Sequence, residues 1–258
     1  MLRFIGWEIV KMLHLRSVRL GLVAAFVLPI IWTLAPGLKQ VYGLVLVSGW
    51  QVPSLALLAG MEFLYPFLVA MAAAEVLGSE VSMGTLKPLL LRPLSRTRFI
   101  VAKLMAALAY PFMVLGVSLF ASILAGLPHG LGGFFGGTGL GGGGFAGEGF
   151  LSAGAAFTEV MQAYFLAAVT LLPIAALSLM FAVWFTSTTA AALGAIATVL
   201  LMRLLIAFPA LKPLLLTTYL DLYLLPEDKA LGVSLLLLAI YTVVFGMLAV
   251  VLFERKDV

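Results

Sequence analysis

Long apolar runs separated by short polar segments dominate the pattern of the chain. A membrane-spanning helix needs about 20 apolar residues, because each residue adds about 1.5 Å across a hydrocarbon layer about 30 Å thick. Six runs meet this requirement, and they predict spans near residues 17–36, 54–77, 102–126, 159–185, 188–208 and 232–253.

Three other segments predict no crossing. Residues 2–14 mix charges with large apolar side chains and a Trp, which predicts a helix lying in the membrane interface. Residues 41–52 are apolar but too short to span, which predicts an interfacial or re-entrant piece on the outer face. Half of the 26 glycines fall within 126–149, which predicts a flexible external loop over residues 126–155.

Composition indicates that lipid is the solvent for much of this surface. Hydrophobic residues make up 64% of the chain and charged residues 10%, whereas a soluble domain has about half and about a quarter. We therefore expect one all-α polytopic membrane domain over residues 1–258. Without Cys, the chain has no disulfides and no thiol chemistry. His14 and His129 are isolated on opposite sides, so we expect no metal site.

The placement of Lys and Arg predicts the orientation, because cytoplasmic loops carry the excess of these residues. With the N-terminus inside, the inner segments hold eleven: Arg3, Lys11, Arg16, Arg19, Lys87, Arg92, Arg96, Arg98, Lys103, Arg255 and Lys256. The outer loops hold three: Lys39, Lys212 and Lys229. Both termini are therefore predicted to be cytoplasmic. The basic residues lie around the inner ends of the spans, as expected for a protein in membrane lipid. We therefore expect no nucleic-acid partner.

The inner loop between the second and third spans is neither a plain linker nor a span. Its apolar residues have helix-like spacing, at Leu86, Leu89, Leu90 and Pro93. Pro88 and Pro93 limit any helix to short pieces. Such an apolar face can lie on the inner leaflet or dock into a groove on a partner protein. The pattern by itself leaves both alternatives open.

The string Glu80-x-x-x-Gly84-Thr85-Leu86-x-x-Leu89-Leu90-x-x-Pro93-x-Ser95-Arg96, followed by Lys103, resembles the signature of ABC-2 family permeases. The N-terminal interfacial helix, six spans and the Phe253-x-Arg255-Lys256-Asp257 ending agree with this family. The resemblance implies a cytoplasmic coupling helix in this loop that sits in a cleft of an ATPase subunit. The chain departs from the family at Pro88 and in its Gly-rich loop.

The resemblance further implies the permease subunit of an ATP-driven exporter in a prokaryotic cell (inner) membrane. The chain has no G-x-x-x-x-G-K-[ST] motif, so ATP and Mg are expected on a separate ATPase subunit, and this chain is not expected to be an enzyme. Six spans make half of an ABC transporter, which implies a second permease copy, in a homodimer or a heterodimer. Gly139, Gly141 and Gly144 match G-x-G-x-x-G but lack the strand and helix that a nucleotide site requires.

Two charges, Glu62 and Arg203, lie well inside the predicted spans, whereas Glu75 and Glu159 lie near span ends. A charge at the bilayer centre costs about 2.5–3.5 kcal/mol on insertion scales. The two side chains are candidates for a structural ion pair or for a substrate path, and Arg203 also has the option of snorkelling to the outer surface. No cofactor is expected to bind this chain.

Two other functions stay open on the sequence. A secondary transporter or channel would have inverted repeats and several midplane charges. A structural subunit of a membrane complex would have no transport path. The substrate is not readable from the residues.

Overall fold

The structure, a computed structural model, describes residues 2–35, 46–85, 95–141, 144–147, 149–185, 187–224 and 231–255. Six helical segments within these residues are long and apolar enough to cross a membrane. They are Arg16–Leu34, Gln51–Ser82, Arg96–His129, Ala153–Phe185, Thr188–Leu205 and Leu231–Glu254. The chain is therefore a multi-pass, all-α membrane protein, as the sequence predicts.

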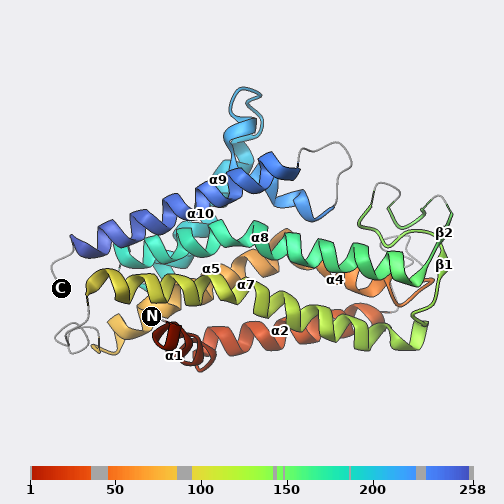
Figure 1. The fold of residues 1–258 in the computed structure, drawn as a ribbon, viewed down its shortest axis with the longest axis horizontal. Coiled ribbons are helices and arrows are strands. Elements are labelled where there is room, and N and C mark those ends of the chain that lie inside the picture. The colour runs from red at the N-terminus through yellow and green to blue at the C-terminus, as the bar shows by residue number, and fades with distance from the viewer. Residues whose placement is uncertain are drawn as a thin grey trace.

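Figure 1 shows how the helices are arranged. The helices are α1 (Leu2–Leu13), α2 (Arg16–Leu34), α4 (Gln51–Ala59), α5 (Tyr65–Ser82), α7 (Arg96–Gly126), α8 (Ala153–Phe185), α9 (Thr188–Leu205) and α10 (Leu231–Glu254). Most run along the bundle, whereas α1 lies across it. Helix α1 and the end of α10 lie at the end of the bundle where α5 stops and α7 begins. Arg96 of α7 donates to the carbonyl of Glu254 there (3.4 Å).

The helices extend beyond the predicted spans. The third begins at Arg96 and the fourth at Ala153, six residues before the predicted starts at 102 and 159. The length of an apolar run corresponds to the thickness of the hydrocarbon layer. A helix can continue beyond that run until its terminal backbone groups are capped. Gln51 and Val52, predicted to lie in an interfacial piece, instead begin the second spanning helix. Residues 41–45 of that piece lie outside the described residues.

Helix α8 forms the centre of the bundle. About 78% of its most apolar window is buried, against 17% for α10 and 22% for α2. Small residues let neighbouring backbones approach closely in a membrane, where packing rather than the hydrophobic effect holds helices together. Those that α8 buries are Ala156, Ala163, Ala167, Ala168, Ala175, Ala176 and Ala182. The peripheral helices keep apolar side chains exposed, as lipid-facing surfaces require.

A π turn joins α4 to α5. It spans Gly60–Leu64, and the N–H of Tyr65 donates to the carbonyl of Gly60. Pro66 follows, which has no N–H and whose ring would press on the carbonyl four residues earlier in a regular helix. The wider turn accommodates this proline and leaves Glu62 and Phe63 exposed.

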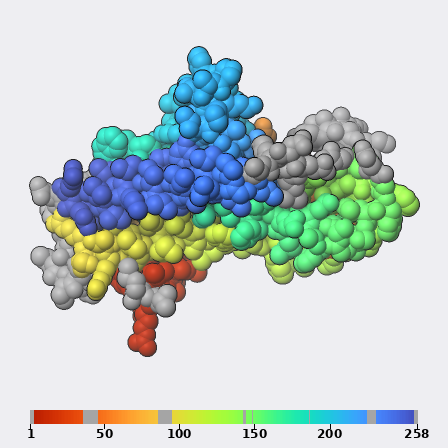
Figure 2. Space-filling model, turned by 45° about the horizontal axis from the view of Figure 1, so that its top comes forward, coloured from red at the N-terminus to blue at the C-terminus, as the bar shows by residue number. Residues whose placement is uncertain are grey.

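Between α9 and α10 the chain forms two 3₁₀ segments, Lys212–Leu214 and η4 (Leu216–Leu224). Figure 2 shows this part of the chain projecting from the side of the bundle. Leu216, Leu222 and Tyr223 are buried, so η4 packs against the helices.

The Gly-rich stretch, expected to be a loop, contains a short β-hairpin in its described residues. Strand β1 (Phe134–Phe135) pairs antiparallel with β2 (Phe150–Leu151), and Phe134 lies opposite Leu151. Leu140 is buried at 1% exposure. Gly130 and four glycines within 136–149 have positive φ, which glycine adopts without strain. We call residues 127–141, 144–147 and 149–151 the hairpin cap.

Side chains of neighbouring helices hold the hairpin cap through its backbone. The indole N–H of Trp50 donates to the carbonyl of Leu131 (2.9 Å), and the amide of Gln51 donates to the carbonyl of Gly137 (3.0 Å). Thr138 donates to Glu159 of α8 (2.8 Å). Glycine-rich backbone has many unshielded carbonyls, and the side chains of Trp50 and Gln51 satisfy two of them.

Candidate functional site

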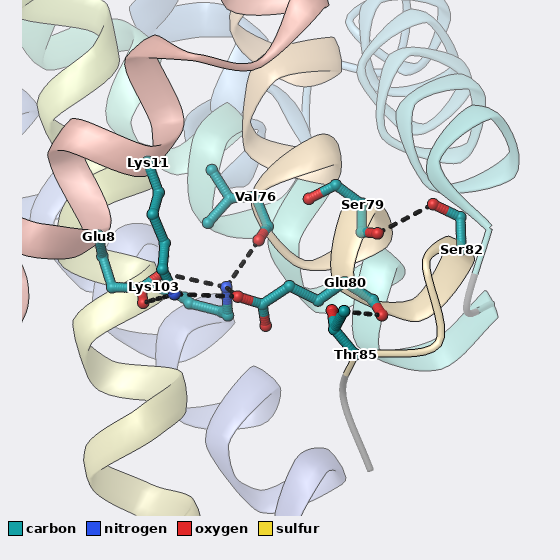
Figure 3. A network of polar contacts seen from close by, with 8 residues as sticks. All are labelled: Glu8, Lys11, Val76, Ser79, Glu80, Ser82, Thr85 and Lys103. Atoms are coloured by element: carbon teal, nitrogen blue, oxygen red, sulfur yellow. Dashed lines mark hydrogen bonds and ion pairs between the residues drawn. The ribbon is translucent and has the colours of Figure 1, made fainter. Parts of the chain in front are cut away.

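A buried lysine joins three helices at the end of the bundle where α5 stops and α7 begins. Lys103 of α7 is 1% exposed, and its Nζ lies 3.1 Å from Oε2 of Glu8 in α1 and 2.9 Å from Oε1 of Glu80 in α5. Its third donor reaches the carbonyl of Val76 (2.8 Å). Figure 3 shows these groups meeting between the helices. The ammonium group therefore donates to Glu8 and to Val76, and it forms an ion pair with the carboxylate of Glu80.

Lys11 of α1 completes the charge balance. Its Nζ lies 2.8 Å from Oε1 of Glu8 and 3.4 Å from Oε1 of Glu80, and its side chain is half exposed. We call Glu8, Lys11, Glu80 and Lys103 the Lys103 cluster. Two carboxylates face two ammonium groups, so the cluster is electrically neutral. Neutrality is what allows charges to stay buried at acceptable cost.

The pKa values of the two cluster members in α1 agree with this pairing. Burial alone would raise the pKa of Glu8, but Lys103 and Lys11 outweigh it and hold that pKa below its ordinary value. Burial alone would lower the pKa of Lys11, and the carboxylates of Glu8 and Glu80 instead raise it. Both groups therefore stay charged at neutral pH.

The second carboxylate oxygen of Glu80 is the exception. It is buried, and it has no hydrogen-bond partner among the described residues. Figure 3 shows it directed away from both lysines. A buried carboxylate oxygen without a donor is costly, so Glu80 is less well satisfied than Glu8.

Gly84 and Thr85 of the ABC-2-like string close helix α5. The N–H of Thr85 donates to the carbonyl of Glu80 (3.0 Å), and the N–H of Gly84 donates to that of Val81 (3.1 Å). This pair of bonds is a Schellman motif, which requires a left-handed residue after the helix. Gly84 supplies it with φ +67°. The motif therefore ends α5 one turn beyond the Lys103 cluster.

Substitution of Gly84 tests this cap. A Cβ added at Gly84 meets no atom within 4 Å, so the cost of Gly84→Ala is conformational only. We expect a loss of about 1–2 kcal/mol in the free energy of unfolding. Gly84→Asn is the matched control and should lose less, because Asn adopts the left-handed conformation more readily. Thermal unfolding followed by tryptophan fluorescence measures both, and equal stability of Gly84→Ala and wild type would contradict the cap.

Ser95 begins α7 on the other side of the loop. Its hydroxyl accepts from the N–H of Arg98 (3.3 Å), which is the ordinary N-cap arrangement. Leu86, Leu89, Leu90 and Pro93 lie outside the described residues, and so does the predicted coupling helix. The described residues of the string thus fix the two ends of this loop, through caps at Gly84 and Ser95 and through the Glu80–Lys103 pair.

A cavity of about 1,040 Å³ lies beside the Lys103 cluster, between α1, α5 and the start of α9. Its polar lining includes Lys11, His14, Glu75, Ser79 and Glu80. Glu75 is half-buried and accepts from the backbone N–H of Ser17 (3.1 Å). The polar groups of this cavity and the loop junction therefore occupy the same end of the bundle.

The structure brings Glu62 and Arg203 to a second, smaller hollow. Both side chains are exposed, and no ion pair joins them within 4.0 Å. Asp221 and Tyr223 of η4 line the same hollow. Burial, and Asp221 next to it, raise the pKa of Tyr223 to about 12, so its hydroxyl keeps its proton. The described residues contain no group of three or more His, Asp or Glu side chains arranged to hold a metal.

Sequence reasoning missed Glu8 and Lys11 as members of the site, and it missed Asp221 and Tyr223. The Glu8–Lys11 spacing of three is a pairing signal within α1. It does not reveal that Glu8 is 2% exposed and faces Lys103. Nothing in the local pattern connects η4 with Glu62.

Comparison with known proteins gives one family. No curated protein matches the chain. The model of a family described as protein of unknown function (DUF2705) matches residues 37–258, which covers five of the six spans and both candidate sites except for the residues of α1. The chain belongs to the DUF2705 family.

Proposed function

We propose that this chain is the permease subunit of an ATP-driven transporter of the ABC-2 class, which works with a separate ATPase subunit. The loop at residues 83–95 is the ATPase-coupling element in this proposal. A second permease copy completes the transport path, and the membrane is the inner membrane of a prokaryotic cell. ATP and Mg bind the partner ATPase.

The Lys103 cluster is the observation that supports this proposal best. A coupling loop must pass a displacement to the spans, so its ends must be joined firmly to them. Glu80 lies four residues before Gly84, and Lys103 lies eight residues after Ser95. Their 2.9 Å pair connects the two sides of the loop, and Glu8 extends the connection to α1. A displacement of the loop would therefore move α1, α5 and α7 together.

The proposal also fixes an orientation, with the Lys103 cluster on the cytoplasmic side. Helix α1, the end of α10 and the facing ends of α5 and α7 lie at one end of the bundle, and the hairpin cap lies at the other. The excess of Lys and Arg belongs to the first of these ends, as the positive-inside rule requires.

Single cysteines test the orientation without background, because the chain has none. Ser82 lies near the end of α5 and His129 lies in the hairpin cap, and both are exposed. We expect His129→Cys to react with a membrane-impermeant maleimide on intact cells. Ser82→Cys should react only after the cells are permeabilised. The reverse pattern would place the proposed coupling loop outside and end the proposal.

Purification with the partner tests the function itself. We expect the chain to co-purify with a soluble ATPase from its native host. Leu90→Asp, in the loop, should abolish this association while the variant remains folded. Glu80→Gln should still associate with the ATPase, because it does not change the loop that docks. It should reduce substrate-stimulated ATP hydrolysis by about tenfold, because it weakens the ion pair between Glu80 and Lys103.

Glu159→Gln is the matched control, because Glu159 of α8 accepts from Thr138 of the hairpin cap at the opposite end. It should leave association unchanged. If the chain never co-purifies with an ATPase, or if Leu90→Asp associates as well as wild type, a channel, secondary transporter or structural subunit becomes the better explanation.

A further inference from the structure

The hollow that contains Glu62 and Arg203 has the shape and charge of a binding site for one small group. We call it the Arg203 hollow. Its chemically distinctive lining residues are Glu62, Phe63, Arg203, Asp221 and Tyr223. They come from the π turn, α9 and η4, three segments far apart in the sequence. Its volume of about 40 Å³ has room for an ammonium or a few waters, but not for a whole organic molecule.

The charges of the Arg203 hollow do not balance. Glu62 and Asp221 supply two negative charges, and Arg203 supplies one positive charge. The Lys103 cluster, at the other site, pairs its charges completely. One uncompensated carboxylate therefore remains in the Arg203 hollow, and its attraction for a cation is strengthened by the surrounding apolar side chains.

Tyr223 gives a second, independent indication of a ligand. Its side chain is only 6% exposed. No hydrogen bond joins its hydroxyl to a described residue, and the hydroxyl oxygen is not itself enclosed by protein. Here the hydroxyl lines the hollow beside the two carboxylates, so its oxygen is available to a bound group.

The aromatic rings narrow the ligand class. Phe63 is 56% exposed at the rim of the hollow and stacks on Phe67, with ring centroids 5.6 Å apart. Aromatic faces attract organic cations, and the attraction grows when the cation loses water. A metal ion would instead need several oxygen ligands in close geometry, and the described residues offer no such group.

We propose that the Arg203 hollow binds the cationic ammonium group of an amphiphilic substrate, with Glu62 and Asp221 as counter-ions and Phe63 and Tyr223 as aromatic walls. The apolar body of the substrate remains outside the hollow, along the exposed apolar surface. The positive charge of Arg203 offsets part of the negative charge of the two carboxylates and so limits the affinity for the ammonium group. This assignment rests on the proposed transport function and adds the substrate class to it.

Binding of dansylcadaverine to the full-length protein in detergent micelles tests the assignment. This probe has a primary ammonium on an apolar fluorescent body, and its N-acetyl derivative has the same body without the charge. We expect saturable binding of the first and only non-saturable partitioning of the second. Equal saturable binding of both would overturn the assignment, because the hollow would then recognise the apolar body.

Three substitutions in the hollow should change the binding of dansylcadaverine, two of them in one direction and the third in the other. Glu62→Gln and Asp221→Asn should each weaken the binding of dansylcadaverine by about tenfold, because each removes a unit charge within a few ångströms of the ammonium. Arg203→Gln should strengthen binding by about fivefold, because it removes the competing cation. Glu159→Gln is the control carboxylate and should have no effect. Weaker binding by Arg203→Gln, or unchanged binding by both Glu62→Gln and Asp221→Asn, would refute the assignment.

The binding assay needs no ATPase, so the two proposals fail separately. If the probe binds as expected but no ATPase associates, the ammonium site stands and the ABC-2 function is lost. If the ATPase associates and the probe shows no saturable binding, the transport function stands and the substrate class is wrong.

Discussion

Lys103→Met should destabilise the protein by about 3–5 kcal/mol, because removal of one partner from a buried ion cluster leaves an uncompensated charge behind. Lys103 is 1% exposed and bonds to Glu8, Glu80 and the carbonyl of Val76. Met has nearly the same length and keeps the packing of the stem. The loss therefore reports charge rather than volume. Thermal unfolding in micelles, followed by tryptophan fluorescence, measures it.

Two further variants make this result interpretable. Lys212→Met removes an exposed lysine that does not belong to the cluster and should change stability by less than about 0.5 kcal/mol. The double variant Lys103→Met with Glu80→Gln restores neutrality, because Glu8 and Lys11 still pair. We expect it to recover at least half of the loss. If Lys103→Met unfolds at the same temperature as Lys212→Met, the Lys103 cluster does not hold the helices together.

The same variant has a functional consequence under the proposed mechanism. A loop joined to α5 and α7 only through their backbone would move without displacing α1. Lys103→Met should then lose coupling while it still associates with the ATPase. The double variant should regain stability but not coupling, since Glu80 and Lys103 no longer form a pair. Stability and coupling are thus separable in one pair of proteins.

Gly126→Ala should be the second strongly destabilising change, by about 1–3 kcal/mol. Gly126 ends α7 next to Gly49, and an added Cβ would lie 2.5 Å from the carbonyl oxygen of Gly49. This neighbour is backbone rather than a flexible side chain, so the chain itself must shift. The N–H of Gly49 also donates to the carbonyl of Gly130 (2.8 Å), so the shift would disturb the attachment of the hairpin cap.

Gly116→Ala in the same helix is the matched control. A Cβ there meets no atom within 4 Å, so we expect no loss of stability and a gain of up to about 1 kcal/mol from helix propensity. Thermal unfolding compares the two, and limited proteolysis reports whether the hairpin cap detaches in Gly126→Ala. If the two variants are equally stable, the close backbone approach of Gly49 and Gly126 is absent.

The fold of the hairpin cap could not be predicted from the sequence. A stretch rich in glycine has no hydrophobic periodicity, and absence of periodicity ordinarily indicates a loop. The sequence therefore predicted flexibility. The fold of the cap depends on positive-φ glycines and on donors from Trp50, Gln51 and Thr138. These donors act across separations of 21 to 86 residues, so no local window contains the information.

The sequence by itself determined the membrane class, the number of spans and their approximate positions. Lipid provides no hydrogen bonds to the backbone, so each crossing must be a long apolar helix, and that requirement is visible residue by residue. Helix ends were less well determined, because Ser95 and Gly84 cap helices that continue past the apolar runs.

Only the tertiary structure decided which charges meet. Glu80 and Lys103 were both named from the sequence, yet Glu8 lies 95 residues from Lys103 and joins them only when α1 crosses the bundle. Glu62 and Arg203 were expected as a possible pair, and the π turn and η4 instead place them in a hollow with Asp221 and Tyr223. The local sequence pattern indicates whether each residue suits lipid or water. The pairing of charges depends on distances between side chains that are set only when the helices pack.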